Sequence, residues 1–178
     1  TGANPWAVTV GDLNGDGKTD RSIVAVTDLS SNLQVDYKDV RLDGTRSILI
    51  TEKVSANGLN SSFTFDVDND SKSDFARFTD VTFLSDGSSV ETFREVYEAN
   101  AAIYGTYGAK KVVYSEVTTR SADGLQSVAE IDTDGDCVVD AVTTETTFIN
   151  QDGSRKEYAE TYYTDGELRS RFENVTSA

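Results

Sequence analysis

Residues 125–149, LQSVAEIDTDGDCVVDAVTTETTFI, place an acidic loop between two stretches that favour β-structure. After the loop, Val142, Thr144, Thr146 and Phe148 stand at alternate positions, with more polar residues between them. A period of two is that of a β-strand with one modestly apolar face and one polar face. The stretch therefore predicts two antiparallel strands joined by the loop.

The acidic loop occurs three times with the same spacing. Oxygen-bearing side chains stand at positions 1, 3, 5 and 9 of nine-residue loops at 12–20, 66–74 and 132–140, called loops one, two and three below. These loops hold eleven of the 31 acidic residues of the chain. Carboxylates crowded in this way repel one another unless a cation lies among them. The loops therefore predict bound cations.

The sequence around the loops also repeats, at an offset of 66 residues. Ser-Ala-Asn-Gly-Leu at 55–59 matches Ser-Ala-Asp-Gly-Leu at 121–125, and Asp-Gly-Ser at 86–88 returns at 152–154. Self-similarity at a fixed period is typical of repeat architectures. The predicted repeats are 1–54, 55–120 with an insertion at 99–110, and 121–176. Because Ser177 and Ala178 resemble the opening of a fourth copy, we expect a segment of a longer array.

Each repeat contains four strand-like stretches separated by turn signals such as Asp-Gly and Asn-Gly. In the third repeat these stretches are 125–131, 140–149, 154–163 and 167–175. The predicted fold is all-β, with twelve strands in tandem antiparallel hairpins that form an elongated meander or solenoid clamped by the acidic loops. Four strands per repeat also suit a propeller blade, and the sequence leaves this alternative open.

Charge and composition restrict the classes of function. The chain carries 31 Asp and Glu against 16 Lys and Arg, a net charge of −15, and 37% of its residues are hydrophobic. So few apolar residues predict a thin core. The acidic surface repels nucleic acid and anionic lipid, and the apolar runs are far shorter than the roughly 20 residues that cross a bilayer. We expect neither nucleic-acid binding nor membrane insertion.

The chain has no histidine and a single cysteine, Cys137. This excludes histidine-ligated zinc, a Ser-His-Asp triad and a thiol activated by histidine. Carboxylates such as Glu157 and Glu160 would act in glycoside hydrolysis only if they faced one cleft, which the sequence does not indicate. We therefore expect that the protein is not an enzyme.

A hard cation such as Ca²⁺ suits the loops, because it takes about 6 to 8 oxygen ligands and odd positions of a tightly wound loop point inward. In loop one the ligands would be the side chains of Asp12, Asn14, Asp16 and Asp20 with the carbonyl of Lys18. The sixth loop position is expected at φ > 0, which Gly17 adopts without strain. Ser71 and Cys137 stand at that position in loops two and three and predict some backbone strain there.

The loops resemble the DxDxDGxxD calcium loops of FG-GAP and VCBS repeats, and the Thr-rich strands between them are similar to repeats of large type I secreted, RTX-associated bacterial proteins. The resemblance covers all three repeats, although its specific motif is only the loop. By this resemblance about three Ca²⁺ ions would bind to Asp12, Asn14, Asp16, Lys18, Asp20, Asp66, Asp68, Asp70, Lys72, Asp74, Asp132, Asp134, Asp136, Val138 and Asp140.

The favoured function is a calcium-binding structural module of an extracellular bacterial surface or secreted protein, which Ca²⁺ makes rigid outside the cell. An alternative is an adhesion or recognition module that binds a glycan or a surface protein through the insertion at 99–110, because insertions of this kind often carry recognition. A calcium-dependent enzyme is the least favoured hypothesis, since it would need an open coordination position beside a base.

Overall fold

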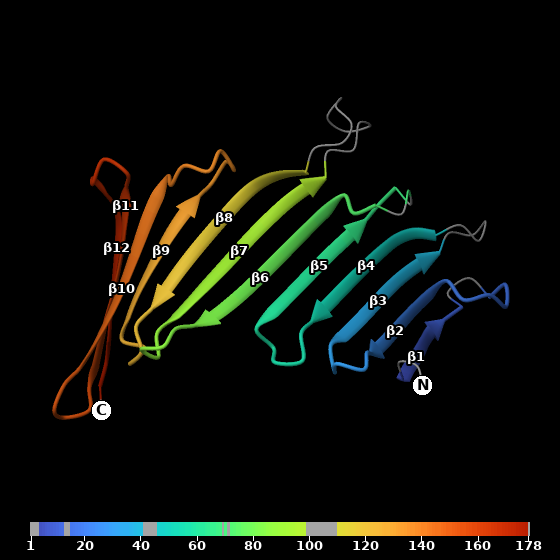
Figure 1. Ribbon diagram of the computed structural model, residues 1–178, viewed down its shortest axis with the longest axis horizontal. Coiled ribbons are helices and arrows are strands. Elements are labelled where there is room, and N and C mark those ends of the chain that lie inside the picture. Colours follow the sequence, from blue (N-terminus) through green and yellow to red (C-terminus); the bar gives the residue numbers. More distant parts are fainter. Residues whose placement is uncertain are drawn as a thin grey trace. The chain divides into compact units, whose positions relative to one another are not determined.

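The computed structural model describes residues 4–12, 15–40, 46–68, 70, 72–98 and 110–177, with the side chains of residues 4–10, 46–47, 98 and 110 left out of the description. Within these residues the chain is all-β (Figure 1). The strands are β1 (Asn4–Gly11), β2 (Arg21–Thr27), β3 (Leu33–Val40), β4 (Arg46–Val54), β5 (Asn60–Asp66), β6 (Phe75–Phe83), β7 (Ser89–Glu98), β8 (Lys110–Arg120), β9 (Gln126–Asp132), β10 (Ala141–Ile149), β11 (Arg155–Tyr163) and β12 (Leu168–Thr176).

The strands form an antiparallel meander. Their order in the sheet, β1 to β12, is their order in the sequence, so that each strand is hydrogen-bonded to the strands before and after it. The all-β meander of hairpins predicted from the sequence is therefore confirmed. Separate four-stranded blades, the propeller alternative, are not the arrangement found.

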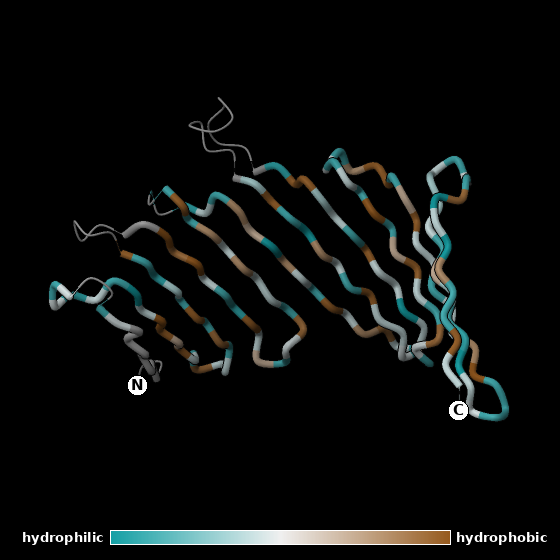
Figure 2. The backbone as a smooth tube through the Cα atoms, turned by 180° about the vertical axis from the view of Figure 1, so that it is seen from behind, coloured by the Kyte–Doolittle hydropathy of each residue, from teal (hydrophilic) through white to brown (hydrophobic). Residues whose placement is uncertain are grey.

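The strand boundaries in the third predicted repeat differ from the prediction by one residue. The observed strands cover 126–132, 141–149, 155–163 and 168–176. Alternating Thr, Val and aromatic residues set the strands, and Asp-Gly turns end them. The hydropathy of the chain alternates along the strands in the same way (Figure 2).

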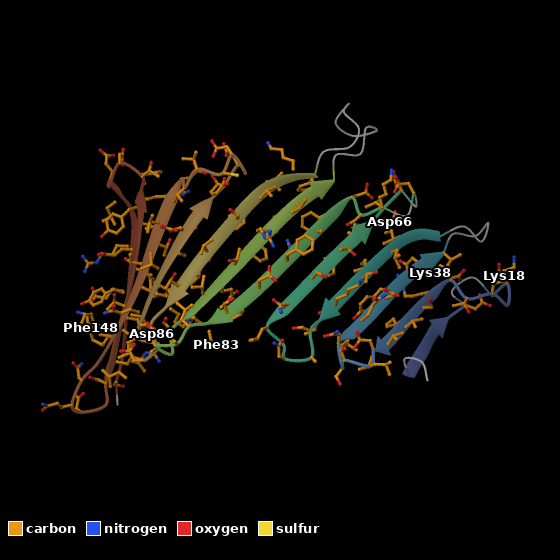
Figure 3. All side chains as sticks on the ribbon, viewed as in Figure 1. Lys18, Lys38, Asp66, Phe83, Asp86 and Phe148 are labelled. Atoms are coloured by element: carbon orange, nitrogen blue, oxygen red, sulfur yellow. The ribbon has the colours of Figure 1, made fainter. Side chains whose placement is uncertain are left out.

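Very few apolar side chains are buried. Among the described residues, the buried hydrophobic ones are Ala25, Ala76, Val96 and Ala141, and no large side chain is fully enclosed. Large apolar residues such as Phe83 and Phe148, labelled in Figure 3, keep 64% and 53% of their surface exposed. The thin core expected from the composition is thus observed. The fold depends on strand hydrogen bonds and cross-strand pairs, which contribute about 0.2–1 kcal/mol each.

Contact density divides the chain into two compact units. Unit 1 contains Thr1–Thr79 and Glu95–Lys111, and unit 2 contains Asp80–Arg94 and Val112–Ala178. Loops one and two belong to unit 1, and loop three belongs to unit 2. The division of the sequence into three repeats stays a prediction.

Asp-Gly-Ser turns repeat their geometry at the predicted offset. Asp86 accepts hydrogen bonds from the backbone N (2.9 Å) and Oγ (2.5 Å) of Ser88. Asp152 accepts the same two bonds from Ser154, at 2.9 and 2.7 Å. In both turns the carboxylate holds the chain where it reverses direction. The hydroxyl of Ser88 lowers the pKa of Asp86, and the backbone bond adds to the effect.

Replacing Ser88 by alanine is expected to destabilise the protein at neutral pH, and to do so less in acid. A carboxylate whose pKa is lower in the folded chain stabilises the fold above its unfolded pKa, and this contribution is lost as the pH falls through the folded pKa. The urea midpoints of wild type and Ser88→Ala should therefore differ by a constant amount above about pH 5 and converge below about pH 4. Ser154→Ala, at the more exposed equivalent turn, should converge with wild type in the same way because Ser154 also lowers the pKa of Asp152, and a difference that grew in acid would contradict the account.

Candidate metal centre

Each acidic loop is held at both ends by strands. Position 9 of the loop donates its backbone N–H to the carbonyl of the residue before position 1, in the pairs Asp20 to Gly11 (3.2 Å), Asp74 to Phe65 (2.7 Å) and Asp140 to Ile131 (2.7 Å). This bond continues the strand pairing and closes the loop. The first and last acidic residues of the loop are thereby brought next to each other.

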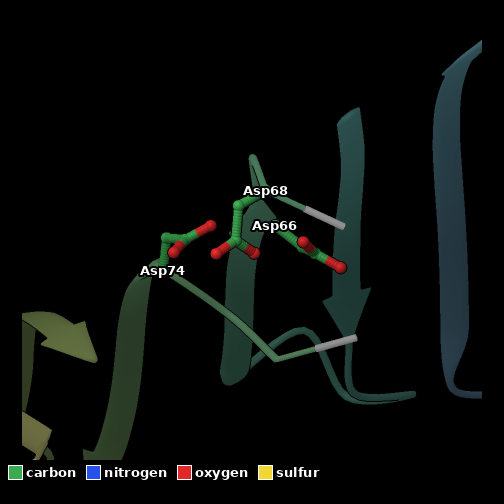
Figure 4. A group of neighbouring side chains, drawn as sticks. All are labelled: Asp66, Asp68 and Asp74. Carbon is green, nitrogen blue, oxygen red and sulfur yellow. The ribbon is translucent and has the colours of Figure 1, made fainter. Parts of the chain in front are cut away.

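Loop two gathers three carboxylates. Asp66, Asp68 and Asp74 each offer an oxygen, and these oxygens lie within 4.8 Å of one another. The three side chains come from the end of β5, from the loop and from the residue just before β6 (Figure 4). Asp66 is buried, with 5% of its surface exposed, whereas Asp68 is exposed. A cation at this point would meet several oxygens and remain open to solvent on one side.

Loop three gathers a second triad. Oxygens of Asp132, Asp134 and Asp136 lie within 4.8 Å of one another, and Asp132 is 5% exposed. The two oxygens of Asp132 accept backbone N–H bonds from Gly135 (2.6 Å) and Cys137 (2.9 Å). These bonds satisfy both oxygens of the buried carboxylate. The loop wraps around its own first residue.

Asp140, at position 9 of loop three, lies outside this triad. Its Oδ2 accepts bonds from the Oγ1 (2.5 Å) and backbone N (2.7 Å) of Thr133. The hydroxyl of Thr133 lowers the pKa of Asp140, and the backbone N–H of Thr133 adds to the effect. This carboxylate is therefore charged over a wider pH range. In loop two the corresponding residue, Asp74, accepts the backbone N–H of Val67 at 2.6 Å and belongs to the triad. The sequence signal of this difference is the residue at position 2, which is Thr133 in loop three and Val67 in loop two.

The described residues of loop one repeat hydrogen bonds of loop three, but they do not form a carboxylate triad. Asp12 accepts N–H bonds from Gly15 (2.5 Å) and Gly17 (2.7 Å), as Asp132 does from the corresponding residues of loop three. Asn14, the predicted ligand at position 3, lies outside the described residues. Among the described residues, groups of three metal-ligating side chains occur in loops two and three.

Positions 5 and 7 are joined in all three loops. The carboxylate at position 5 accepts the N–H of position 7, in the pairs Asp16 with Lys18 (2.9 Å), Asp70 with Lys72 (2.8 Å) and Asp136 with Val138 (2.7 Å). Lys72 also approaches the carboxylate of Asp70 through its ammonium group at 3.7 Å. The bond bends the loop between these residues. All predicted ligands of loops two and three are described, and their role as ligands stays a prediction.

The sixth loop position adopts the predicted left-handed backbone. Gly17 has φ 82° and Cys137 has φ 69°, while Gly15 and Gly135, two residues earlier, have φ 80° and 72°. The expectation for Cys137 is confirmed, and that for Ser71 falls outside the described residues. A side chain larger than glycine is strained at such a φ. The exposed Cys137 therefore occupies an unfavourable conformation.

Cys137→Gly should relieve this strain. Roughly 1 kcal/mol is expected for a non-glycine residue at positive φ, which corresponds to about fivefold in a dissociation constant when the loop takes up this φ on binding the ion. Isothermal titration calorimetry of the loop three site with Ca²⁺ measures the change. Cys137→Ala is the control, because it removes the thiol and keeps the strain. Equal affinities of Cys137→Gly and wild type at that site would contradict the strain argument.

Loop three also touches the neighbouring strand β8, which the sequence does not predict. A Cβ atom built on Gly135 would lie 1.8 Å from the carbonyl oxygen of Val112. At Gly15 and Gly17 in loop one, such an atom would meet no atom of the described residues within 4 Å. Gly135 is therefore required by a close approach as well as by its φ. The contact packs loop three onto the backbone of unit 2.

Glu157 and Glu160 do not face a common cleft in the part of the chain that the structure describes. Being three residues apart in β11, they lie on opposite faces of the sheet. Glu157 borders a hollow of about 300 Å³ in unit 2 and is ion-paired with Arg155 at 2.7 Å, whereas Glu160 accepts the hydroxyl of Tyr162 at 2.6 Å. These two carboxylates do not flank a common substrate position.

Comparison of the chain with protein families, with curated proteins and with solved structures finds no match. The resemblance to FG-GAP and VCBS calcium loops therefore stays an expectation from the sequence. In the described part of the chain, no helix has the length and apolar character needed to span a membrane. What the fold and the candidate site establish together is an all-β meander with two acidic triads that could hold a metal ion.

Proposed function

We propose that this chain is a calcium-binding structural repeat module of an extracellular bacterial surface or secreted protein. The observation that carries the proposal is the pair of carboxylate triads at the ends of β5 and β9, each with oxygens within 4.8 Å of one another. Both triads begin with a buried aspartate, Asp66 or Asp132. A buried carboxylate in a chain of net charge −15 gains most from a neutralising cation.

The donor set favours a hard cation. Carboxylate and carbonyl oxygens suit Ca²⁺ or Mg²⁺, whereas zinc and copper prefer the imidazole and thiolate groups that these loops largely lack. Exposed members such as Asp68, Asp134 and Asp136 leave room for water and for variable geometry, which Ca²⁺ tolerates better than Mg²⁺. When bound, the ion would neutralise the loop carboxylates. The proposed ligands are the acidic side chains of the three loops with Asn14 and the carbonyls of Lys18, Lys72 and Val138.

A structural role for the ion follows from the thin core. With four buried hydrophobic residues in the described chain, side-chain burial contributes little to rigidity. Each loop joins two neighbouring strands, so a bound ion would tie the ends of those strands together. In unit 1, loops one and two join β1 to β2 and β5 to β6, four strand positions apart. At about 4.8 Å per strand, the ions would recur roughly every 19 Å along that unit.

The extracellular location is part of the proposal and rests on the affinity for Ca²⁺ that we expect of these loops. Partly exposed loops without the bidentate glutamate of an EF-hand are expected to bind Ca²⁺ in the range of extracellular modules, with Kd of about 10⁻⁴–10⁻³ M. Sites of this strength fill only where Ca²⁺ is abundant. The module would therefore become rigid after export.

Single substitutions test the proposed ligands. Asp66→Asn and Asp132→Asn should each remove one Ca²⁺ per chain in isothermal titration calorimetry, because each removes the carboxylate around which its loop is wound. Asp123→Asn is the matched control: this aspartate lies in the turn before β9, where it accepts bonds from Ser121 and Leu125. Stoichiometry that fell equally in all three variants, or in none, would count against the assignment.

The recognition alternative depends on the insertion at 99–110, of which residues 99–109 lie outside the described residues. Nothing in the described part of the chain favours a glycan or a surface protein as a partner. That alternative and the absence of enzymatic activity stay predictions.

A further inference from the structure

The backbone of loop three packs against β8, the neighbour of β9 in unit 2. A Cβ atom built on Gly135 would clash with the carbonyl group of Val112 and would lie 2.9 Å from the backbone nitrogen of Val113. The α-hydrogen that Gly135 carries in this direction therefore points at the peptide bond between these two residues. A Cα–H···O contact of this kind is a weak hydrogen bond. Only glycine permits it here, because any other residue would place its Cβ there.

The exposure of the loop residues agrees with this packing. Gly135 is half-buried, although Asp134 and Asp136 on either side of it are exposed. Loop one follows β1, the first strand of the sheet, and there the corresponding Gly15 is exposed, as is Asp12. Two loops with the same spacing of ligands therefore differ in their surroundings, because loop three has a preceding strand to pack on.

The contact lies beyond the last residue pair that joins β8 to β9. The register of these strands runs from Arg120 opposite Ser127 to Ser115 opposite Asp132, and Asp132 is also the residue at which β9 ends. The residues Val112–Tyr114, called the start segment of β8 below, come before Ser115 in the chain. Strand β9 therefore offers the start segment no cross-strand partner, and loop three contacts it instead.

We propose that a Ca²⁺ ion bound in loop three fixes the start segment of β8, so that local opening of this segment depends on calcium. Gly135 lies between Asp134 and Asp136, two members of the triad. Its backbone N–H donates to the third member, Asp132, at 2.6 Å. An ion that holds the three carboxylates together therefore also holds the residue that touches β8. The inference rests on the proposed calcium site and names the strand on which that site acts.

Charge repulsion gives the coupling its direction. Without a cation, the three carboxylates repel one another, and the repulsion favours a wider loop that withdraws Gly135 from β8. The start segment would then lose a contact on the side that β9 does not cover. Because coupling between two sites is reciprocal, anything that fixes the start segment should also tighten the calcium site. The insertion predicted at 99–110 ends where β8 begins, so calcium would act on the strand that follows it.

Native-state hydrogen–deuterium exchange of the whole chain, read at single amides by NMR in excess Ca²⁺ and in EDTA, tests the inference. In EDTA the amides of the start segment should exchange through local openings. The rate of such openings changes little with small additions of urea, because they expose little surface. An ion at a hundredfold excess over its Kd lowers the population of the empty loop about a hundredfold. Ca²⁺ should therefore slow exchange in the start segment by about tenfold or more.

Gly135→Ala separates the contact from the ion. This variant keeps every carboxylate of loop three, so calorimetry at saturating Ca²⁺ should still count the ion of this loop. Its Cβ pushes the loop away from β8, and Ca²⁺ should then slow exchange in the start segment by less than about twofold. Gly17→Ala, at a similar φ in loop one, is the matched control and should keep the full effect. The wild-type measurement uses no variant and decides the question even if Gly135→Ala does not fold.

Three results would overturn the inference and leave the calcium site standing. The first is an ion in loop three, counted by its loss in Asp132→Asn, with unchanged exchange in the start segment. The second is exchange in the start segment that follows global unfolding in urea, since no local opening would then depend on the ion. The third is full slowing by Ca²⁺ in Gly135→Ala. If loop three binds no ion at all, calorimetry contradicts the proposed function itself, and the inference fails with it.

Discussion

Removing Ca²⁺ with EDTA should lower the free energy of unfolding by about 2.7 kcal/mol for each loop that was held at a hundredfold excess of Ca²⁺ over its Kd. An ion that binds only the folded chain stabilises it by mass action, and each loop contributes separately. For a chain of this length, one such loop corresponds to about 5–10 °C in melting temperature. The effect should be large here because few side chains are buried.

Differential scanning calorimetry in excess Ca²⁺ and in EDTA, at constant ionic strength, measures this shift. The double variant Asp66→Asn with Asp132→Asn should lose most of it, while Asp123→Asn should keep it in full. Superimposable wild-type melting curves with and without Ca²⁺ would show that the loops are ordinary turns.

Gly135→Ala should destabilise the chain by about 2–4 kcal/mol even in EDTA, where no metal contributes. The new Cβ would lie 1.8 Å from the carbonyl oxygen and 2.4 Å from the carbonyl carbon of Val112, so loop three has to move away from β8. Strain at φ 72° adds to this cost. Urea denaturation monitored by circular dichroism measures the loss.

Gly17→Ala separates the two causes. Its φ of 82° carries similar strain, but a Cβ there meets no atom of the described residues within 4 Å, so a loss of only about 1 kcal/mol is expected. Equal losses in Gly135→Ala and Gly17→Ala would mean that the approach of loop three to Val112 does not matter for stability.

Local sequence patterns predicted the fold well. Period-two alternation and Asp-Gly turns fix strands and their ends within a few residues, and a chain of consecutive hairpins has one simple topology, the meander. The left-handed backbone at Cys137 also followed from loop position alone. Short-range rules were sufficient for these features because every strand pairs only with its sequence neighbours.

The candidate site was less predictable, because it depends on how each loop uses its carboxylates. Identical spacing in loops two and three leads to different triads, with Asp74 included in one and Asp136 in the other. Thr133 draws Asp140 aside through its hydroxyl, and Val67 has no hydroxyl with which to do the same. The approach of Gly135 to Val112 joins residues that are distant in sequence, which no local pattern encodes.

Crystals grown in millimolar Ca²⁺ test the central claim most directly, through anomalous scattering from calcium. We predict anomalous peaks among Asp66, Asp68 and Asp74, and among Asp132, Asp134 and Asp136, each with oxygen ligands at about 2.3–2.6 Å, and a third peak in loop one. Ordered loops two and three that hold only water under these conditions would contradict the account.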